Sequence, residues 1–376
     1  MLVPFSYNLR SLWLRKARTA LTVVGIGAVV AVYIVMTAVS GQMKRMFKTT
    51  AQPDEVIVFQ AGAITPEFSQ VSRTVATWLA TQPQVVSEGG RPVVSTEHSL
   101  ASRVTLPGGR EQDGLLRGLE PSSVAFYREY ALVDGAPLSS GTSVLVGVQF
   151  ARAQGLKVGD VLTFERARWT VGGLFSAKGG VYEQEVWVDL DALGAAANRP
   201  DVTGFMVRTH SVADAKALVD FVSNQRGEPV QALTAEASFA RVGGMSLWMS
   251  ALGRFIAIII ALGAIFGGMN TMYAAVAQRT RELGVLRALG FRKVAVLLSM
   301  LFESIGVGVL GGAVGVVLAF AVARVPLNMP FLLGGGVPLG AGDLGAGLVL
   351  GLLVGALGGF LPALQAGSTK VVDALR

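Results

Sequence analysis

The sequence predicts an integral membrane protein with four transmembrane α-helices and one large α+β extracytoplasmic domain. Four apolar runs are each long enough to cross a bilayer, because a helix of ~20 residues spans the ~30 Å hydrocarbon core. A long, more polar stretch, residues 43–249, separates the first run from the other three. Charged residues make up 15% of the chain, against roughly 25% in an ordinary soluble domain. This balance indicates a few spans joined to one soluble domain.

The order of the runs gives the expected domain organisation. We expect a cytoplasmic amphipathic lead-in (1–18), a first span (19–42), the extracytoplasmic domain (43–249), a second span (250–277), a cytoplasmic coupling loop (278–293), a third span (294–324), a short external loop (325–343), a fourth span (344–366) and a cytoplasmic tail (367–376). A cleaved signal peptide is the alternative for the first run. The apolar region of such peptides is usually ~7–15 residues long, however, and this run is longer.

Inside the extracytoplasmic domain we expect a split α/β module, residues 52–119 and 199–235, interrupted by a β-rich insertion at 120–198. One helix is predicted to start at Thr65-Pro66-Glu67, because a hydroxyl, a proline and an acid are typical of a helix start. It is expected to stop before Pro83 and to bury one face that consists of Phe68, Val71, Val75, Trp78 and Leu79. A second helix begins at Ser211, which forms a capping-box pattern with Asp214. Strands are expected around 85–94, 102–106, 114–119, 143–148, 160–164, 169–172, 185–188, 203–209 and 229–233.

The distribution of Lys and Arg in the short loops predicts the topology. The loop 278–293 carries Arg279, Arg281, Arg287, Arg292 and Lys293, whereas 325–343 has neither Lys nor Arg. By the positive-inside rule the first loop is cytoplasmic and the second external. Both termini are then cytoplasmic in a multi-pass membrane protein. Since membrane orientation explains much of the net charge of +7, no nucleic-acid partner is expected.

Glycines in the last two spans predict closely packed helices. They recur at four-residue spacing at Gly347, Gly351, Gly355 and Gly359, and as the pairs Gly308/Gly312 and Gly311/Gly315. Small residues at i and i+4 let helix backbones approach each other in lipid. A single pair has a simpler explanation, since membrane helices are rich in glycine. The four-step series predicts a packed interface, in the bundle or in a dimer.

Two polar residues lie within the predicted spans. An ionised carboxylate in a bilayer is costly, so Glu303 is expected to face the bundle, a partner helix or water. We favour a structural or interfacial role for Glu303 over a proton-coupled one. Asn270 in the second span is interpreted as an interhelical hydrogen-bonding residue.

The sequence provides no candidate for catalysis or for cofactor or metal binding. Cysteine is absent, and the two histidines, His98 and His210, lie far apart. The chain has no GxxxxGK[ST] phosphate-binding loop, no GxSxG elbow and no HExxH helix. We therefore expect no enzyme activity in this chain. A partner must supply the energy for any work that it does.

The loop 278–293 has the most family-specific sequence in the chain. The run Arg279-Thr-Arg-Glu-Leu-Gly-Val-Leu-Arg-Ala-Leu-Gly-Phe-Arg-Lys293, then Glu303 and Gly311-Gly-Ala-Val-Gly315, closely resembles the FtsX-like permease domain of MacB-type (type VII) ABC transporters. Arg18-Thr-Ala-Leu-Thr-Val-Val-Gly-Ile-Gly27, Val144-Leu-Val-Gly-Val148 and Asp373-Ala-Leu-Arg376 resemble the start, the periplasmic domain and the C-terminal signature of that family. The resemblance covers essentially the whole chain.

The resemblance implies a permease of the bacterial inner membrane that acts as a dimer, with a cytoplasmic ABC ATPase bound to each protomer through the loop. The ATPase-coupling residues are then Arg279, Arg281, Glu282, Leu283, Gly284, Val285, Leu286, Arg287, Ala288, Leu289 and Gly290. No nucleotide-binding domain is fused to this sequence, so the ATPase, with its ATP and Mg, is expected to be a separate polypeptide. The tail carries Val371 where the family usually has proline.

Three functions remain open within that family. The first is export of a periplasmic substrate with an adaptor (membrane-fusion) protein and an outer-membrane duct. The second is release of lipoproteins by a Lol-type permease. The third is FtsX-like signalling to a cell-wall hydrolase. The permease partner is expected to be a second copy, with a heterodimer as the alternative. The size of the extracytoplasmic domain, 43–249, favours the first two functions.

Overall fold

The structure is a computed structural model that describes residues 16–225, 229–324 and 337–368 of the 376-residue chain. Most of the predicted lead-in, most of the external loop and most of the tail lie outside these residues. The chain divides into two compact units. The helical unit contains the described residues of Met1–Ser40, Leu247–Val325 and Val337–Arg376, and the α/β unit contains those of Gly41–Ser246. Each unit is described separately below.

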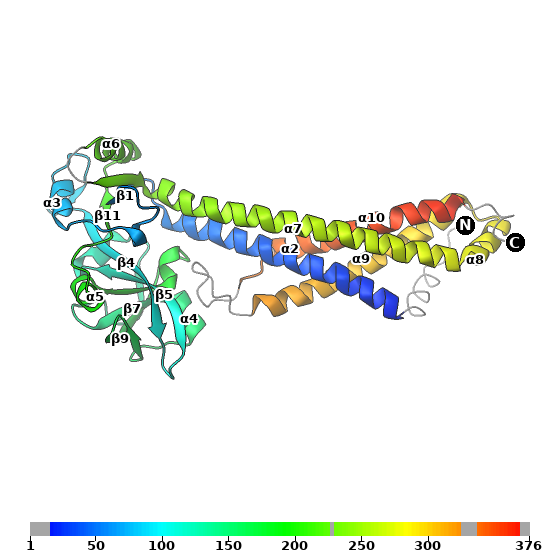
Figure 1. Cartoon of the computed structure of the whole chain (residues 1–376), viewed down its shortest axis with the longest axis horizontal. Helices are drawn as coiled ribbons and strands as arrows, with labels where there is room; N and C mark the ends of the chain where they lie inside the picture. Colours follow the sequence, from blue (N-terminus) through cyan, green and yellow to red (C-terminus); the bar gives the residue numbers. More distant parts are fainter. Residues whose placement is uncertain (1–15, 226–228, 325–336, 369–376) are drawn as a thin grey trace. The chain divides into compact units, whose positions relative to one another are not determined.

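Long apolar helices form the helical unit (Figure 1). They are α2 (Lys16–Thr50), α7 (Ala235–Gln278), α9 (Lys293–Ala323) and α10 (Ala341–Ser368), with the short α8 (Thr280–Ala288) between α7 and α9. Among the described residues, four helices are long and apolar enough to cross a membrane. Apolar contacts between α2, α7, α9 and α10 centre on buried residues such as Val30, Ile34 and Ala319.

Two of these helices extend beyond the predicted spans. The last turns of α2 continue to Thr50 and are amphipathic, with Met46 and Thr50 buried and Lys44, Arg45 and Lys48 exposed. The first turn of α7 starts at Ala235, directly after a strand. Within the α/β unit, Phe47 of α2 and Phe239 of α7 contact each other with ring centroids 5.9 Å apart. The extra turns form because their apolar faces pack on this unit.

The α/β unit is built on one ten-stranded sheet with the order β12-β1-β11-β4-β5-β10-β7-β9-β6, and β8 pairs with β4 and β9. The strands are β1 (Glu55–Gln60), β4 (Val94–Thr105), β5 (Glu111–Leu119), β6 (Ala131–Gly135), β7 (Ser143–Gly147), β8 (Val161–Phe164), β9 (Ala167–Ser176), β10 (Glu185–Asp189), β11 (Gly204–Arg208) and β12 (Val230–Thr234). The pairs β5–β10 and β7–β9 are parallel, and the other pairs are antiparallel. The β-rich insertion therefore extends the sheet of the split module instead of forming a separate one.

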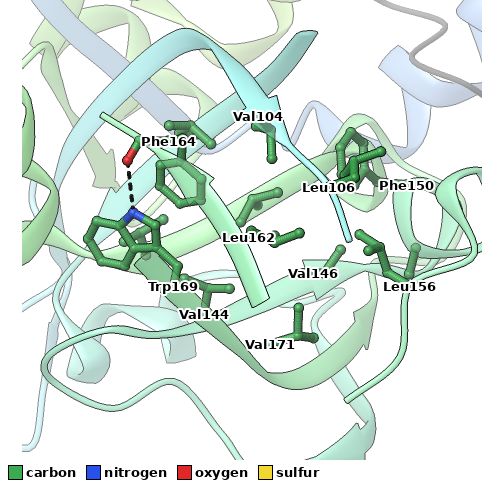
Figure 2. Close-up of a cluster of buried hydrophobic side chains, with 14 of the residues drawn as sticks. Val104, Leu106, Val144, Val146, Phe150, Leu156, Leu162, Phe164, Trp169 and Val171 are labelled. Atoms are coloured by element: carbon green, nitrogen blue, oxygen red, sulfur yellow. Dashed lines mark hydrogen bonds between the residues drawn. The ribbon is translucent and has the colours of Figure 1, made fainter. Parts of the chain in front are cut away.

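Short helices cover the sheet and bury its apolar residues (Figure 1). They are α3 (Thr74–Ala80), α4 (Val148–Gln154), α5 (Leu190–Ala197) and α6 (Val212–Ser223), with 3₁₀ turns at Pro66–Phe68, Pro121–Phe126 and Val181–Gln184. The insertion shares one apolar cluster with β4 and β5 of the split module, which contribute Val104 and Leu116. In this cluster Trp169 stacks on Phe164, with ring centroids 4.9 Å apart. Figure 2 shows this cluster and the hydrogen bond that Trp169 Nε1 donates to the Phe164 carbonyl at 3.2 Å.

The helix predicted from Thr65 to Pro83 is wrong. The structure has a 3₁₀ turn at Pro66–Phe68 and then α3 from Thr74, and the Thr65 side chain makes no capping hydrogen bond. Between them Val71 pairs with Val202, each amide donating to the other's carbonyl at 2.8 and 3.1 Å. Such bridge pairing holds Val71 in an extended conformation that a helix cannot accommodate. Phe68, which the prediction buried, is 80% exposed.

The strand predicted over 85–94 is also different. A two-stranded hairpin, β2 (Ser87–Glu88) and β3 (Arg91–Pro92), occupies most of it, and β4 starts at Val94. Gly89 and Gly90 form the turn with φ of +57° and +78°, values that L side chains rarely adopt. The predicted cap of α6 is confirmed, since Ser211 Oγ accepts a hydrogen bond from the Asp214 amide at 3.1 Å.

Candidate functional site

The candidate site is α8, which the turn at Arg279 joins directly to the end of α7. The Thr280 hydroxyl donates to the carbonyl oxygens of Val276 at 3.1 Å and Ala277 at 3.0 Å. Thr280 therefore satisfies carbonyls at the end of α7. At the other end Gly290 has a φ of +91°, the left-handed conformation that commonly ends a helix. The helix α9 follows from Lys293.

The inner face of α8 packs on the bundle. Leu283 is 3% exposed and belongs to an apolar cluster whose other members are Met272, Val276, Val296, Met300, Ala363 and Ala366. These residues come from α7, α9 and α10. Gly284 is buried beside Leu283. Both residues were predicted to be ATPase-coupling residues. In the structure both are buried, and Leu283 packs on the helices of its own chain.

The outer face of α8 is exposed. Arg281, Glu282, Val285, Ala288 and Leu289 are all accessible, with Val285 45% and Leu289 72% exposed. Residues 281, 285 and 288/289 repeat at helical spacing, so they form one stripe. A stripe with a cation and two exposed apolar side chains is suited to contact with another protein. The placement of the Leu286 and Arg287 side chains lies outside the described part of α8.

A buried ion pair lies where α7 meets α8. Arg279 Nη1 is 3.4 Å from Glu303 Oε2 of α9, and the two side chains are 9% and 8% exposed. The prediction that Glu303 faces the interior of the bundle is consistent with this position. Arg279 differs from its predicted role, because its side chain points to the interior and not to an ATPase. Sequence reasoning did not pair the two residues, which lie on different helices.

The predicted glycine contacts lie within the bundle of one chain. A Cβ on Gly308 would lie 2.5 Å from the carbonyl oxygen of Gly351 and 2.8 Å from the Cα of Gly355. The backbones of α9 and α10 therefore touch. Another face of α9 contacts α2, since a Cβ on Gly311 would meet Ile26 and one on Gly315 would meet Val30, both at 2.6 Å. The remaining members also have neighbours in the chain: Gly312 faces Leu348, Gly347 faces Ile34 and Gly359 faces Ser304.

The helix α7 leaves its polar residue on the outside. Asn270 is exposed, so the structure does not place it between helices of this chain as predicted. On the same helix, a Cβ on Gly263 or Gly267 would meet no heavy atom of the described chain within 4 Å.

Comparisons with known proteins assign the chain to a family. The MacB-like periplasmic core domain matches residues 19–225, and the FtsX-like permease C-terminal region matches residues 254–371. The chain belongs to the MacB/FtsX family of ABC transporter permeases. It is therefore a multi-pass membrane protein whose α/β unit is the extracytoplasmic domain of a MacB-type permease. The second match includes α8, Glu303 and the glycines of α9 and α10.

Individual relatives match over part of their length. The ABC transporter permeases YvrN and YknZ of Bacillus subtilis (strain 168) are 35% identical over 124 residues and 26% identical over 202 residues; these alignments cover 32% and 51% of this chain and 29% and 49% of the relatives. The macrolide export ATP-binding/permease protein MacB of Hahella chejuensis is 26% identical over 234 residues, 58% of this chain and 35% of that protein. The chain thus spans between about a third and half of the length of these MacB-type relatives.

Solved structures from the same family show weaker similarity. The periplasmic region of MacB from Actinobacillus actinomycetemcomitans aligns with 53% of this chain and 97% of that structure, with a TM-score of 0.40 and 13% identity. The extracellular domain of YknZ from Gram-positive bacteria aligns with 48% of this chain and 99% of that structure, with a TM-score of 0.36 and 14% identity.

The extracytoplasmic domain of this MacB-type permease contains a buried polar cluster that sequence reasoning missed. Arg117 of β5 makes a two-point contact with Glu185 of β10, at 2.6 and 2.7 Å, and a further ion pair with Glu97 of β4. The Tyr127 hydroxyl donates to Glu97. Burial raises the pKa of Glu97. Part of the signal was present in the sequence, since Arg117 lies in the largely apolar segment 114–119 and a charged residue needs a partner when it is buried.

A neighbouring carboxyl group predicts a pH dependence. Burial raises the pKa of Glu55 from 4.5 to about 8 despite the nearby Arg208 and Arg128. Glu55 is then protonated in the folded protein and ionised in the unfolded one between these pH values. Its stabilising contribution is complete below pH 4.5 and is lost as the pH rises to 8, at no more than about 1.4 kcal/mol per pH unit.

We expect the urea midpoint of the full chain in detergent to fall between pH 5 and pH 8, and Glu55→Gln to reduce that fall. Glu97 has a shift in the same direction, so a part of the fall should remain in the variant. Equal pH dependence in Glu55→Gln and the parent would contradict the assignment.

Proposed function

We propose that this permease passes the work of a separate cytoplasmic ABC ATPase to its extracytoplasmic domain and thereby exports a periplasmic substrate. The ATPase binds the exposed face of α8. A second permease copy completes the transporter, and an adaptor protein and an outer-membrane duct carry the substrate onward. The name of the Hahella chejuensis relative, which joins macrolide export, ATP binding and permease, supports export over the other activities.

The observation that carries this proposal is the two-sided character of α8. Its inner face is buried through Leu283, and its outer face exposes Val285 and Leu289. Among the described side chains of this helix, Leu283 packs on the bundle, which gives no reason for Val285 and Leu289 to be exposed. An ATPase groove that receives Val285 and Leu289, with an acidic group opposite Arg281, accounts for the whole stripe.

The bundle offers a route for the movement. The helix α8 lies between α7 and α9 in sequence, and α9 contacts α10 and α2 through its glycines. Residues of α2 and α7 also belong to the extracytoplasmic domain. In our proposal the ATPase shifts α8, the bundle shifts with it, and α2 and α7 pass the shift to the domain. The basic residues of 278–293 support a cytoplasmic α8 and cytoplasmic termini.

The test is a single added charge on the exposed stripe. We expect Leu289→Asp to reduce retention of the ATPase by the affinity-tagged permease about tenfold or more, because a carboxylate would be buried at an apolar contact. The permease is co-expressed with each free-standing ABC ATPase of the source organism in turn. Retention is measured by quantitative immunoblotting of the purified complexes.

The matched control is Phe68→Asp, since Phe68 is 80% exposed in the extracytoplasmic domain. This variant carries the same added charge and should retain the ATPase as the parent does. Because the chain has no cysteine, single cysteines introduced at the exposed positions 64 and 288 of each variant, labelled with a membrane-impermeant maleimide, confirm correct insertion. Undiminished retention by correctly inserted Leu289→Asp would exclude this face as the docking site. The genes beside this one distinguish export from the two other functions. A paralogous permease gene would indicate lipoprotein release, and genes for a hydrolase with a coiled-coil activator would indicate signalling.

A further inference from the structure

Arg279 and Glu303 connect the start of α8 to the interior of α9. Arg279 immediately precedes the first residue of α8, Thr280, and its amide donates to the Val276 carbonyl at 3.0 Å. Its guanidinium lies 3.4 Å from the Glu303 carboxylate. Counted from Lys293, the first residue of α9, Glu303 is about 15 Å along the helix at ~1.5 Å per residue. The pair therefore reaches well beyond the surface on which α8 lies.

The region around Glu303 connects several helices. The next residue, Ser304, donates its hydroxyl to the Gly355 carbonyl of α10 at 2.6 Å. Both residues line a cavity whose other polar members are Thr19, Thr22 and Thr271 and whose apolar members include Ile26, Met272 and Val354. These residues come from α2, α7 and α10 as well as α9. A displacement at Glu303 is thus applied where α9 meets its three neighbours.

The ion pair differs in its chemistry from the apolar packing of Leu283. Leu283 packs in an apolar cluster, and such packing is not directional. A charged hydrogen-bonded pair depends steeply on distance and geometry in a medium of low dielectric constant. Removing either partner leaves a charge buried in the bundle. Both interactions hold α8 against α9, and the ion pair is the one whose energy changes more steeply when α8 moves.

We propose that Arg279 and Glu303 are positioning residues that couple α8 mechanically to α9. Movement imposed on α8 pulls or pushes Arg279, and the ion pair transfers that movement to Glu303 and hence to α9, α10 and α2. This inference rests on the proposed function, because the ATPase must act on α8 for the link to carry its movement. The pair transfers movement and does not itself bind the ATPase.

The experiment separates a link from a purely structural ion pair. Arg279→Met/Glu303→Met replaces both charges with apolar side chains, and such replacements of buried pairs often preserve or raise stability. Two quantities are measured on the purified complex: the amount of retained ATPase and the stimulation of ATP hydrolysis that the permease gives it. We expect normal retention and a fall in stimulation of at least about fivefold, the scale of a typical coupling energy. Stimulation within twofold of the parent would overturn the proposal.

Two more variants complete the design. Arg281→Met removes an exposed cation two residues away from Arg279 and is the control for loss of positive charge. We expect it to lower the amount of retained ATPase more than it lowers the stimulation of ATP hydrolysis per bound ATPase. If the double methionine variant does not fold, Glu303→Asp decides, because it keeps the charge and draws the carboxylate back by one methylene group. We expect Glu303→Asp to lose stimulation severalfold with retention intact, and unchanged stimulation would overturn the proposal. If the parent itself retains no ATPase, the proposed function fails and not the link.

Discussion

Gly308→Ala is expected to lower the stability of the helical unit, whereas Gly306→Ala is expected to raise it slightly or leave it unchanged. A Cβ on Gly308 would lie 2.5 Å from the Gly351 carbonyl oxygen, so α9 and α10 must separate to admit one methyl group. Overpacking of this kind costs about 1–3 kcal/mol. At Gly306, two residues earlier on the same helix, a Cβ would meet no heavy atom of the described residues within 4 Å.

The two variants make the sign of the effect decisive. Alanine favours a helix over glycine by about 1 kcal/mol, so both substitutions would stabilise the protein if helix propensity alone acted. The measurement is the thermal midpoint of the purified full chain in detergent, followed by circular dichroism. An increase in the midpoint for Gly308→Ala equal to that for Gly306→Ala would show that α9 and α10 do not touch at this glycine.

Arg117→Met is expected to have the largest effect in the extracytoplasmic domain. It removes the cation between Glu97 and Glu185, whose side chains are 7% and 1% exposed. Breaking a buried ion pair by removing one partner costs about 3–5 kcal/mol, because the remaining charge has no compensation. The measurement is urea unfolding of the full chain, followed by tryptophan fluorescence. Trp187 is one of five tryptophans that contribute to this signal, and it lies at the site, since its Nε1 donates to Glu185 at 3.0 Å.

The control for Arg117 is Arg103→Met on the neighbouring strand β4. The Arg103 side chain is 70% exposed and lies 3.5 Å from Glu111, and exposed pairs of this kind contribute at most about 1 kcal/mol. We therefore expect a small change for Arg103→Met. A comparable loss of stability in both variants, or none in Arg117→Met, would show that the buried cluster does not hold β4, β5 and β10 together.

The membrane helices were the most predictable part of the fold. Their apolar runs need no tertiary information, because the bilayer itself determines how long a spanning helix must be. The glycine spacing also predicted close packing, and the structure places Gly308 against Gly351 and Gly355. Which helix each glycine meets was not predictable, since spacing along one helix says nothing about its neighbour.

The site was predictable in position and not in detail. The sequence of 279–290 identified α8. It places leucines on both faces of this helix, however, and only packing distinguishes buried Leu283 from exposed Leu289. The contact between Arg279 and Glu303 depends on how α7 and α9 pack, so local patterns could not reveal it. In the extracytoplasmic domain, the expected helix at 65–83 failed because pairing between Val71 and Val202 overrides a local start signal.

The placement of β1 and β12 has a mechanical consequence. The two strands are antiparallel neighbours, and Val56 at the start of β1 pairs with Thr234 at the end of β12. Since α2 leads into β1 and α7 follows β12, both helices pull on the same end of one ladder. A force that separates the two helices would break the hydrogen bonds between β1 and β12 one residue pair at a time. A force that moves both helices in the same direction would leave these hydrogen bonds unstressed. The extracytoplasmic domain is therefore built to withstand joint movement of α2 and α7 and to yield when they separate.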